Sequence, residues 1–207
     1  MLNFYMTPGS CSTGIHILLE ELDLLFSAYV LNLPAGDTQK PDFLAINPKG
    51  TIPVLVTDEG VVLTEFASIA WWLAVKHPKA GLLPEDITSQ AQVLEILNYA
   101  VSTIHGHGFT RIFTPERYLF REEDKAGILR QGKSLVAKGF NTIEKQFGGK
   151  TGYLFDQFTI ADAALFYVEF WANRTELPLP PFCRQHFNTM ISRPVVKRVL
   201  AEEGYRV

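Results

Sequence analysis

The sequence has few cysteines, no long apolar run and no excess of basic residues. Its 207 residues include only Cys11 and Cys183, too few for a disulfide framework, which indicates a reducing, cytoplasmic setting. The most apolar stretch, residues 60–75, carries Glu65 near its centre, so no membrane helix is expected. A net charge of −3 excludes the overall basic character of a nucleic-acid-binding protein. The first residues lack a basic leader and an apolar segment, so no export signal is expected.

Composition and charge divide the chain in two. Hydrophobic residues make up 47% and charged residues 20%, as in ordinary globular proteins. Residues 1–77 hold 8 acidic and 3 basic side chains, whereas residues 78–207 hold 14 and 16. Two prolines and a glycine within residues 77–84 have the composition of a linker. We therefore expect an α/β domain over 1–77, a linker over 78–87 and an all-α domain over 88–207.

Hydrophobic periodicity predicts the elements of the first domain. Strands are expected over 2–6, 29–33, 53–56 and 61–63, and helices over 11–25, 41–45 and 65–76. Turn residues at 57–60 predict a hairpin between the last two strands. Strands separated by a helix and followed by a hairpin indicate a βαβ unit within a mixed sheet.

The rest of the chain has helical spacing. Helices are expected over 88–106 and, as one or two segments, over 115–147. Thr159 followed by Asp162 has the spacing of a capping box. The run 163–171 is almost entirely apolar, so this helix should form the core of the second domain.

Cys11 is the first candidate for chemistry. It follows a strand and a turn and opens a helix, where N–H groups and the helix dipole should lower a thiol pKa and favour a nucleophilic thiolate. The alternative is a small buried apolar residue, which is also our expectation for Cys183. Ser10 and Ser12 either donate to a sulfur anion or cap the helix. Tyr5 either donates likewise or packs in the core.

Two other segments could bind a ligand. A cis bond between Ile52 and Pro53 would hold the peptide groups of Ile52 outward, where they could pair with a ligand backbone. Glu65 lies where a strand runs into a helix, and it either holds an ammonium group or only favours the helix start. His105 and His107 lie two residues apart without a nearby ligand set, so no metal site is expected.

Four motifs occur together along the chain. They are Phe4-Tyr5 with Pro8-Gly9-Ser10-Cys11-Ser12, Asn47-Pro48-Lys49-Gly50 with Ile52-Pro53-Val54-Leu55, Leu63-Thr64-Glu65, and Phe158-Thr159-Ile160-Ala161-Asp162. In this order and spacing the chain resembles the glutathione S-transferases over essentially its whole length. Tyr5, Cys11, Asn98-Tyr99 and His105 make it most similar to the bacterial beta class. The resemblance implies a thioredoxin-like N-terminal domain, an all-helical C-terminal domain and a homodimer.

The resemblance also implies a role for individual residues, with glutathione as co-substrate and no metal. Cys11 would contact the glutathione sulfur or form a mixed disulfide with it, Ile52 would pair with its backbone, and Glu65 would hold its γ-glutamyl group. The implied catalytic residues are Cys11, Tyr5, Ser12 and His105. The implied glutathione contacts are Ser10, Lys40, Thr51, Ile52, Pro53, Glu65, Phe66 and Asn98. The implied electrophile contacts are Tyr99, Ile104, His107, Phe109, Phe113 and Tyr118.

The chain departs from the family pattern at three places. Phe66 stands where the family usually has serine or glycine. The beta-class lysine at the glycine end of glutathione falls near Ala35 or Gly36, which leaves Lys40 as the nearest candidate. The histidine motif is one residue longer than in the beta class, so both His105 and His107 remain candidates.

The function we expect is conjugation of the glutathione thiolate to small apolar electrophiles. Thiol–disulfide exchange through Cys11 would give disulfide reductase or peroxidase activity instead. The rival from another class is a non-catalytic ligand-binding or interaction module of the same fold.

Overall fold

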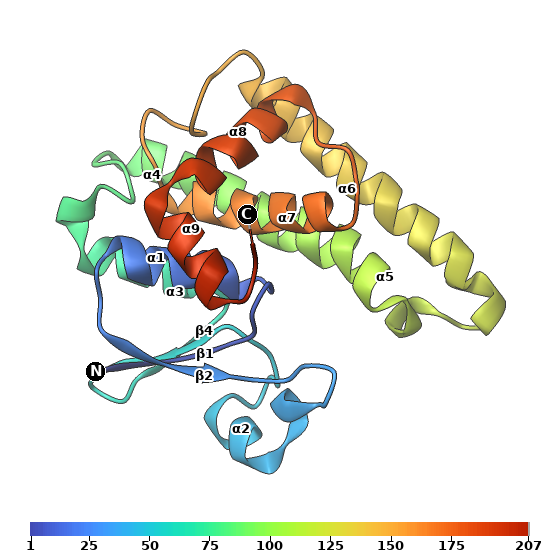
Figure 1. Ribbon diagram of the computed structural model, residues 1–207, viewed down its shortest axis with the longest axis horizontal. Coiled ribbons are helices and arrows are strands. Elements are labelled where there is room, and N and C mark those ends of the chain that lie inside the picture. The colour runs from blue at the N-terminus through green and yellow to red at the C-terminus, as the bar shows by residue number, and fades with distance from the viewer. Residues whose placement is uncertain (207) are drawn as a thin grey trace. The chain divides into compact units, whose positions relative to one another are not determined.

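The computed structural model describes residues 1–206, and its chain divides into two units (Figure 1). The first comprises Met1–Glu85 together with the residues from Ile191 onward, and the second comprises Asp86–Met190. The C-terminal residues therefore group with the first unit, not with the helical domain expected over 88–207. The reason is that the last helix, α9 (Pro194–Glu202), packs on α1 (Ser12–Glu21).

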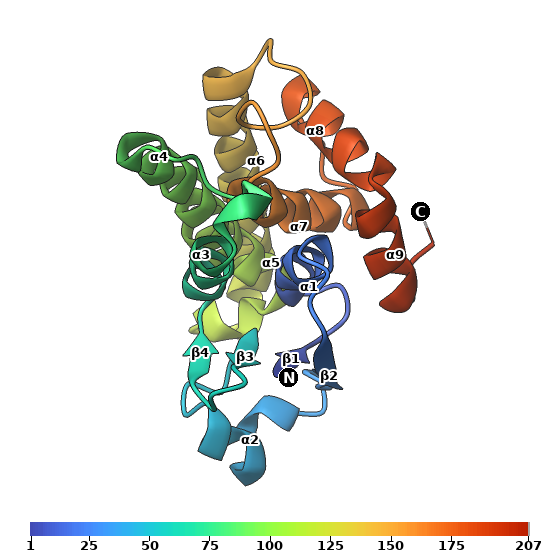
Figure 2. The ribbon, with the colours of Figure 1, turned by 90° about the vertical axis from the view of Figure 1, so that its left-hand side faces the viewer.

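The first unit is a four-stranded mixed sheet with helices on both faces. Its strands are β1 (Leu2–Met6), β2 (Phe26–Val30), β3 (Val54–Val56) and β4 (Val62–Thr64), in the order β2-β1-β3-β4. Strand β2 is parallel to β1, whereas β3 is antiparallel to both β1 and β4. Helices α1 and α3 (Phe66–Lys76) cover one face and α2 (Pro41–Ile46) covers the other (Figure 2). This is the thioredoxin-like arrangement, and the predicted hairpin is confirmed.

Helix α1 ends earlier than its hydrophobic pattern predicts. Asp23 adopts a left-handed φ of 51°, and the Leu24 N–H donates to the carbonyl of Leu19 at 3.1 Å. This is a Schellman ending with aspartate at the position that usually holds glycine, so no glycine marked it in the sequence. The following strand consequently begins at Phe26, three residues before the expected start at Tyr29.

The second unit is helical. Its elements are α4 (Ile87–Asn98), a π-helical segment (Tyr99–Phe109), α5 (Thr110–Phe113), α6 (Lys125–Phe147), α7 (Ile160–Arg174) and the greater part of α8 (Pro181–Ser192). The expected helix over 88–106 thus continues, without a break, to residue 113. A π-helix holds more residues in each turn than an α-helix, which lets it absorb an inserted residue. The histidine motif that is one residue longer than the beta-class pattern lies within this segment.

Helix α7 forms the core of the second unit, as predicted. Its residues from Ile160 to Ala172 are all buried. The capping box is confirmed, because the Asp162 carboxylate accepts the Thr159 N–H at 2.7 Å. No helix among residues 1–206 has both the length and the apolar character to cross a bilayer.

Candidate active site

The loop that joins β1 to α1 carries Cys11. Helix α1 begins at Ser12, so Cys11 occupies the N-cap position. The Ser10 Oγ accepts the Ser12 N–H at 3.1 Å, which is the task expected of a capping serine. The Ser12 hydroxyl is fully buried and lies 3.1 Å from both the N–H and the carbonyl of Thr7. These contacts tie the loop together and give both serines a role within it.

The Cys11 thiol does not have the lowered pKa that its place at a helix start predicts. Burial raises the pKa to about 12, which outweighs the lowering by the N–H groups of Cys11 and Ser12. The negative charge of Glu65 raises it further. At neutral pH the side chain is therefore a protonated thiol, and it donates to the carbonyl of Ile52 at 3.6 Å.

The second segment of the site contains Ile52 and Pro53. The peptide bond between them is cis, the conformation that would hold the peptide groups of Ile52 outward. Asn47 holds the preceding turn, since its Nδ2 donates to the carbonyl of Thr51 at 2.8 Å. The contact with Cys11 joins this segment to the start of α1, across 41 positions of sequence.

Glu65 marks the third segment, between β4 and α3. Its φ of 70° is a left-handed conformation that is uncommon for residues with side chains and often accompanies functional sites. Lys49 donates to the Glu65 carboxylate at 2.8 Å and to the Thr64 hydroxyl at 2.9 Å. The Phe66 side chain is buried, so it packs in the first unit. Glu65, in contrast, is exposed, at the positive pole of α3.

Tyr5 lies in an aromatic cluster on the α2 side of the sheet. Its ring stacks on Tyr29 at 4.8 Å and meets the edge of Phe43 at 5.9 Å. Burial and the neighbouring Tyr29 raise its pKa, so the hydroxyl stays protonated. The neighbouring strand residue Phe4 instead contacts His16 of α1. These contacts support the packing role for Tyr5.

Within the second unit, the candidate residues separate by burial. Ile104 and Phe109 are fully buried, so their side chains pack within this unit. Ile104 fills the space beside Gly139, and Phe109 stacks on Phe113 at 5.4 Å. Phe113 is itself exposed.

The remaining polar candidates of this unit lie along the continuous helix that ends at Phe113, except Tyr118, which lies in the short helical turn Pro115–Tyr118 beyond it. Asn98 and His107 are exposed, whereas Tyr99 and Tyr118 are half-buried. His105 meets the ring of Trp171 edge-on at 4.7 Å, and its Nδ1 lies 3.2 Å from the Tyr167 hydroxyl. Burial lowers the pKa of His105 to about 4, so this imidazole is neutral at pH 7.

Comparison with known proteins identifies the family. Residues 9–76 match the profile of the glutathione S-transferase N-terminal domain, and residues 126–202 match that of the C-terminal domain. Glutathione S-transferase GstA of Escherichia coli O157:H7 is 32% identical over 209 residues, which cover 99% of this chain and 100% of that protein. The chain belongs to the glutathione S-transferase family. Membership favours a glutathione transferase enzyme over a non-catalytic module of the same fold.

Solved structures agree with this assignment. A glutathione transferase homologue from Sulfitobacter, crystallised with bound glutathione, superposes with a TM-score of 0.88 at 29% identity over 98% of each chain. A beta-class glutathione S-transferase from Sphingomonas chungbukensis superposes with a TM-score of 0.82 at 28% identity, again over 98% of each chain.

Sequence reasoning about this transferase overlooked Lys49 as a site residue. Its motif was noted, but lysine 16 positions before Glu65 carries no signal of contact, because only the fold brings β4 beside that turn. The candidate Lys40 pairs with Asp37 at 2.7 Å. Cys183 is buried, as expected, and burial raises its pKa.

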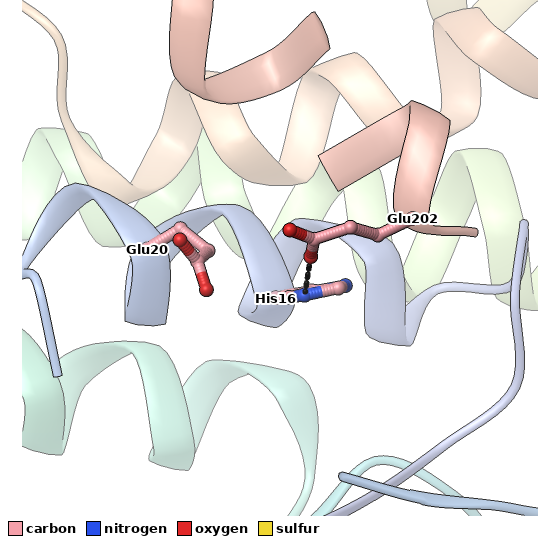
Figure 3. A group of neighbouring side chains, drawn as sticks. All are labelled: His16, Glu20 and Glu202. Carbon is pink, nitrogen blue, oxygen red and sulfur yellow. Dashed lines mark ion pairs between the residues drawn. The ribbon is translucent and has the colours of Figure 1, made fainter. Parts of the chain in front are cut away.

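One group of side chains among residues 1–206 approaches the geometry of a metal site. The ligand atoms of His16, Glu20 and Glu202 lie within 4.8 Å of one another (Figure 3). Each is already engaged, however: Glu202 contacts His16 at 3.4 Å and Glu20 accepts from Arg198 at 2.6 Å. His105 and His107 are not part of this group. These contacts explain the three side chains without an ion.

Proposed function

We propose that the first unit binds glutathione and activates its thiol, and that the second unit supplies side chains for a small apolar electrophile. The observation that carries this proposal is the convergence of Cys11, Ile52 and Glu65 from three separate segments. The bound glutathione of the Sulfitobacter homologue supports it.

Each segment offers glutathione a different kind of contact. The peptide groups of Ile52 pair with the cysteinyl part of the tripeptide. Glu65 attracts the γ-glutamyl ammonium group, while the positive pole of α3, which Phe66 opens, attracts the adjacent carboxylate. Lys49 keeps the Glu65 carboxylate in place.

Three further residues are proposed as glutathione contacts. Lys40 and Thr51 are both exposed and serve the glycine end and the backbone of the tripeptide. Asn98 is an exposed amide at the end of α4 and serves as a further contact.

The nucleophile is the sulfur of glutathione itself. A Cys11 thiol with a pKa of about 12 is a hydrogen-bond donor at neutral pH and a poor attacking group. It turns its proton from the Ile52 carbonyl towards the incoming thiolate. The glutathione thiol releases its proton to solvent water, the resulting thiolate forms a carbon–sulfur bond with the electrophile, and the leaving group departs with its electron pair. This chemistry favours conjugation over exchange through a mixed disulfide.

The electrophile is bound by the accessible part of the second unit. Phe113, Tyr99 and Tyr118 offer aromatic surface, and His107 is an exposed polar group beside them in sequence. His105 is neutral and packed against Trp171, so it acts as an uncharged polar contact.

Cys11→Ala tests the role of the thiol. We expect the variant to keep glutathione binding and to lose about tenfold or less in conjugation of chlorodinitrobenzene, because one hydrogen bond to a charged group is removed. Any disulfide exchange that the wild type performs through Cys11 should disappear. Cys183→Ala, at the other cysteine, should change neither activity. Unchanged conjugation and exchange in Cys11→Ala would reduce Cys11 to packing, and a wild type that binds no glutathione would end the proposal.

Glu65→Gln tests the binding site. Removing the charge should raise KM for glutathione about tenfold with little change in kcat, since an ion-pair contact is lost equally in the ground and transition states. The exposed Glu95→Gln on α4 is the matched control and should behave as wild type. Equal KM values for wild type and Glu65→Gln would exclude Glu65 as a contact.

We also propose that the transferase is a cytoplasmic homodimer that detoxifies electrophiles. The exposed side chains of Val61, just before β4, and of Trp71 and Val75 on α3 line one hollow, which fits a second copy. Two unpaired cysteines fit a reducing compartment. Sedimentation should give a dimer for the wild type and a monomer for Trp71→Glu, and a monomeric wild type would contradict the assembly.

A further inference from the structure

Glu203 lies just after α9, and its carboxylate contacts the segment that carries Cys11. It accepts hydrogen bonds from the Gly9 N–H at 2.7 Å and the Thr13 hydroxyl at 2.7 Å, and it lies 2.9 Å from His16 Nδ1. Its side chain is only 1% exposed. A carboxylate that is buried this deeply and surrounded by three donors is held in one position. Two of the donors, Gly9 and Thr13, flank Cys11 at a distance of two residues.

Ion pairs also join α1 and α9 along their length. Arg193, at the start of α9, pairs with Glu21 at 2.6 Å, and Arg198 pairs with Glu20 at 2.6 Å. Glu202 then contacts His16 (Figure 3). The two helices therefore run antiparallel, and these ion pairs end beside the first residues of α1.

The end of α9 is itself fixed by local structure. Gly204 adopts a φ of 86°, its N–H donates to Ala201 at 3.0 Å, and the Tyr205 N–H donates to Leu200 at 2.8 Å. This is a Schellman ending with glycine in its usual place. It turns the chain directly after Glu203 and returns Tyr205 towards the β1–α1 loop.

Tyr205 meets the same loop at Gly9. The Tyr205 hydroxyl donates to the carbonyl of Pro8 at 3.5 Å. A Cβ at Gly9 would lie 2.0 Å from the Tyr205 hydroxyl, and Gly9 also has a φ of 71°. Glycine is thus required at position 9 because of both its positive φ and the nearby Tyr205 hydroxyl. Glu203 and Tyr205, which lie near the C-terminus, both hold the β1–α1 loop.

We propose that Glu203 is a positioning residue for the transferase reaction. By holding Gly9 and Thr13 it directs the N–H groups at the start of α1, and the Cys11 thiol, at the sulfur of bound glutathione. This inference rests on the proposed function. The benefit comes from position, because a second negative charge near a thiolate would disfavour it.

Three variants separate position from charge. Glu203→Ala removes every contact. Glu203→Gln keeps an acceptor for Gly9 and Thr13 and presents an amide to His16, so it keeps the geometry without the charge. Glu202→Gln is the matched control, since this neighbour is half-exposed and contacts only the other nitrogen of His16.

The decisive readout is the titration of bound glutathione, followed through its thiolate absorbance, with kcat/KM and the melting temperature measured alongside. In Glu203→Ala the pKa of the bound thiol should rise by about one unit, which lowers kcat/KM below that pKa about tenfold. Glu203→Gln should restore both values to within about threefold of wild type, and Glu202→Gln should match wild type.

Two results would overturn the inference. One is a folded Glu203→Ala variant with a lower melting temperature but a wild-type thiol titration and kcat/KM, which is the result expected of a merely structural residue. The other is Glu203→Gln failing as severely as Glu203→Ala, which would assign the effect to charge.

A second variant covers the case in which Glu203→Ala does not fold. Thr13→Val removes one of the three donors and should move the thiol titration in the same direction, with about a threefold loss in kcat/KM. No movement would overturn the inference. Wild-type protein that binds no glutathione would instead overturn the proposed function itself, so the two failures are distinguishable.

Discussion

Two helix starts in this transferase are held by a buried carboxylate that also contacts a histidine. At α7, Asp162 accepts the Thr159 N–H and lies 3.1 Å from Nε2 of His186. At α1, Glu203 accepts the Gly9 N–H and contacts His16. The chemistry is alike, but Asp162 is three residues from the group it caps, whereas Glu203 is 194 residues away.

This difference in sequence distance distinguishes a helix cap that supports folding from one that supports the reaction. The start of α7 is coded locally, so its cap can form as soon as that turn forms, and it anchors the core of the second unit. The start of α1 receives the Glu203 contacts only when α9 is docked. An opening of α9 would therefore remove them from the Cys11 loop.

Asp162→Ala should have the largest effect. The substitution leaves the N–H groups of Leu154 and Thr159 and the imidazole of His186 without their acceptor. We expect a loss of about 3–5 kcal/mol in the free energy of unfolding, measured by denaturant titration. Asp156→Ala, an exposed neighbour, should lose less than about 0.5 kcal/mol. Similar losses of unfolding free energy in both variants would show that Asp162 stabilises the fold no more than an exposed aspartate does.

His186 of α8, which contacts Asp162 at the start of α7, predicts a loss of stability at alkaline pH. Burial alone would lower the pKa of His186, but the carboxylates of Glu169 and Asp162 outweigh burial and raise it to about 10. A folded pKa above the unfolded value of about 6.5 stabilises the fold below pH 6.5, and this stabilisation is lost as the pH rises towards 10. Burial also raises the pKa of Glu169, to about 7, which acts in the same direction.

Melting temperatures at pH 6, 8 and 10 check this prediction. The wild type should lose stability on the alkaline side, by about 1.4 kcal/mol for each unit by which the His186 pKa is raised. His186→Gln should be less stable at neutral pH but less sensitive to alkali. A His186→Gln variant with the same alkaline slope as wild type would contradict it.

His105 contrasts with His186, because its ring nitrogen faces a tyrosine hydroxyl instead of a carboxylate. Burial lowers its pKa to about 4, so its stabilisation is complete above pH 6.5 and is lost as the pH falls towards 4. The sign is opposite to that of His186. We expect an acid-side loss of about 1–2 kcal/mol after allowing for partial exposure. His105→Phe should reduce the acid-side slope in melting experiments, and an unchanged slope would refute this assignment.

Thr159→Ala and Thr13→Val should have the smallest effects, and together they compare the two helix starts most directly. Each removes one hydroxyl that donates to the carboxylate at its helix start, at 2.8 Å and 2.7 Å. Each should cost about 1 kcal/mol of stability. Only Thr13→Val should alter the titration of bound glutathione. If Thr159→Ala alters it equally, the division between a folding cap and a functional cap is wrong.

Local rules predicted a large part of the fold. The 57–60 hairpin, the capping box at Thr159 and the buried run of α7 each depend on residues close together in sequence, and all were confirmed. The early end of α1 was missed because Asp23 takes a conformation usually given to glycine.

The candidate site was predicted less evenly. The motifs predicted Cys11, Ile52 and Glu65 as site residues. Of the two alternatives for Cys11, the structure favours the protonated thiol, because burial outweighs the helix start. Ile104 and Phe109 were assigned to an electrophile site because aromatic and aliphatic residues at helical spacing do not reveal which of them faces the core. Lys49 was overlooked as a site residue for want of any local signal.

The sequence by itself determined the elements, their order and the family, since these depend on periodicity, turn chemistry and motif spacing. Only the tertiary structure decided which groups share a hydrogen bond across 41 or 194 positions, and how deeply each titratable side chain is buried. Both depend on distances that chain connectivity does not fix. The charge of Cys11 and the partners of Glu203 follow from those distances.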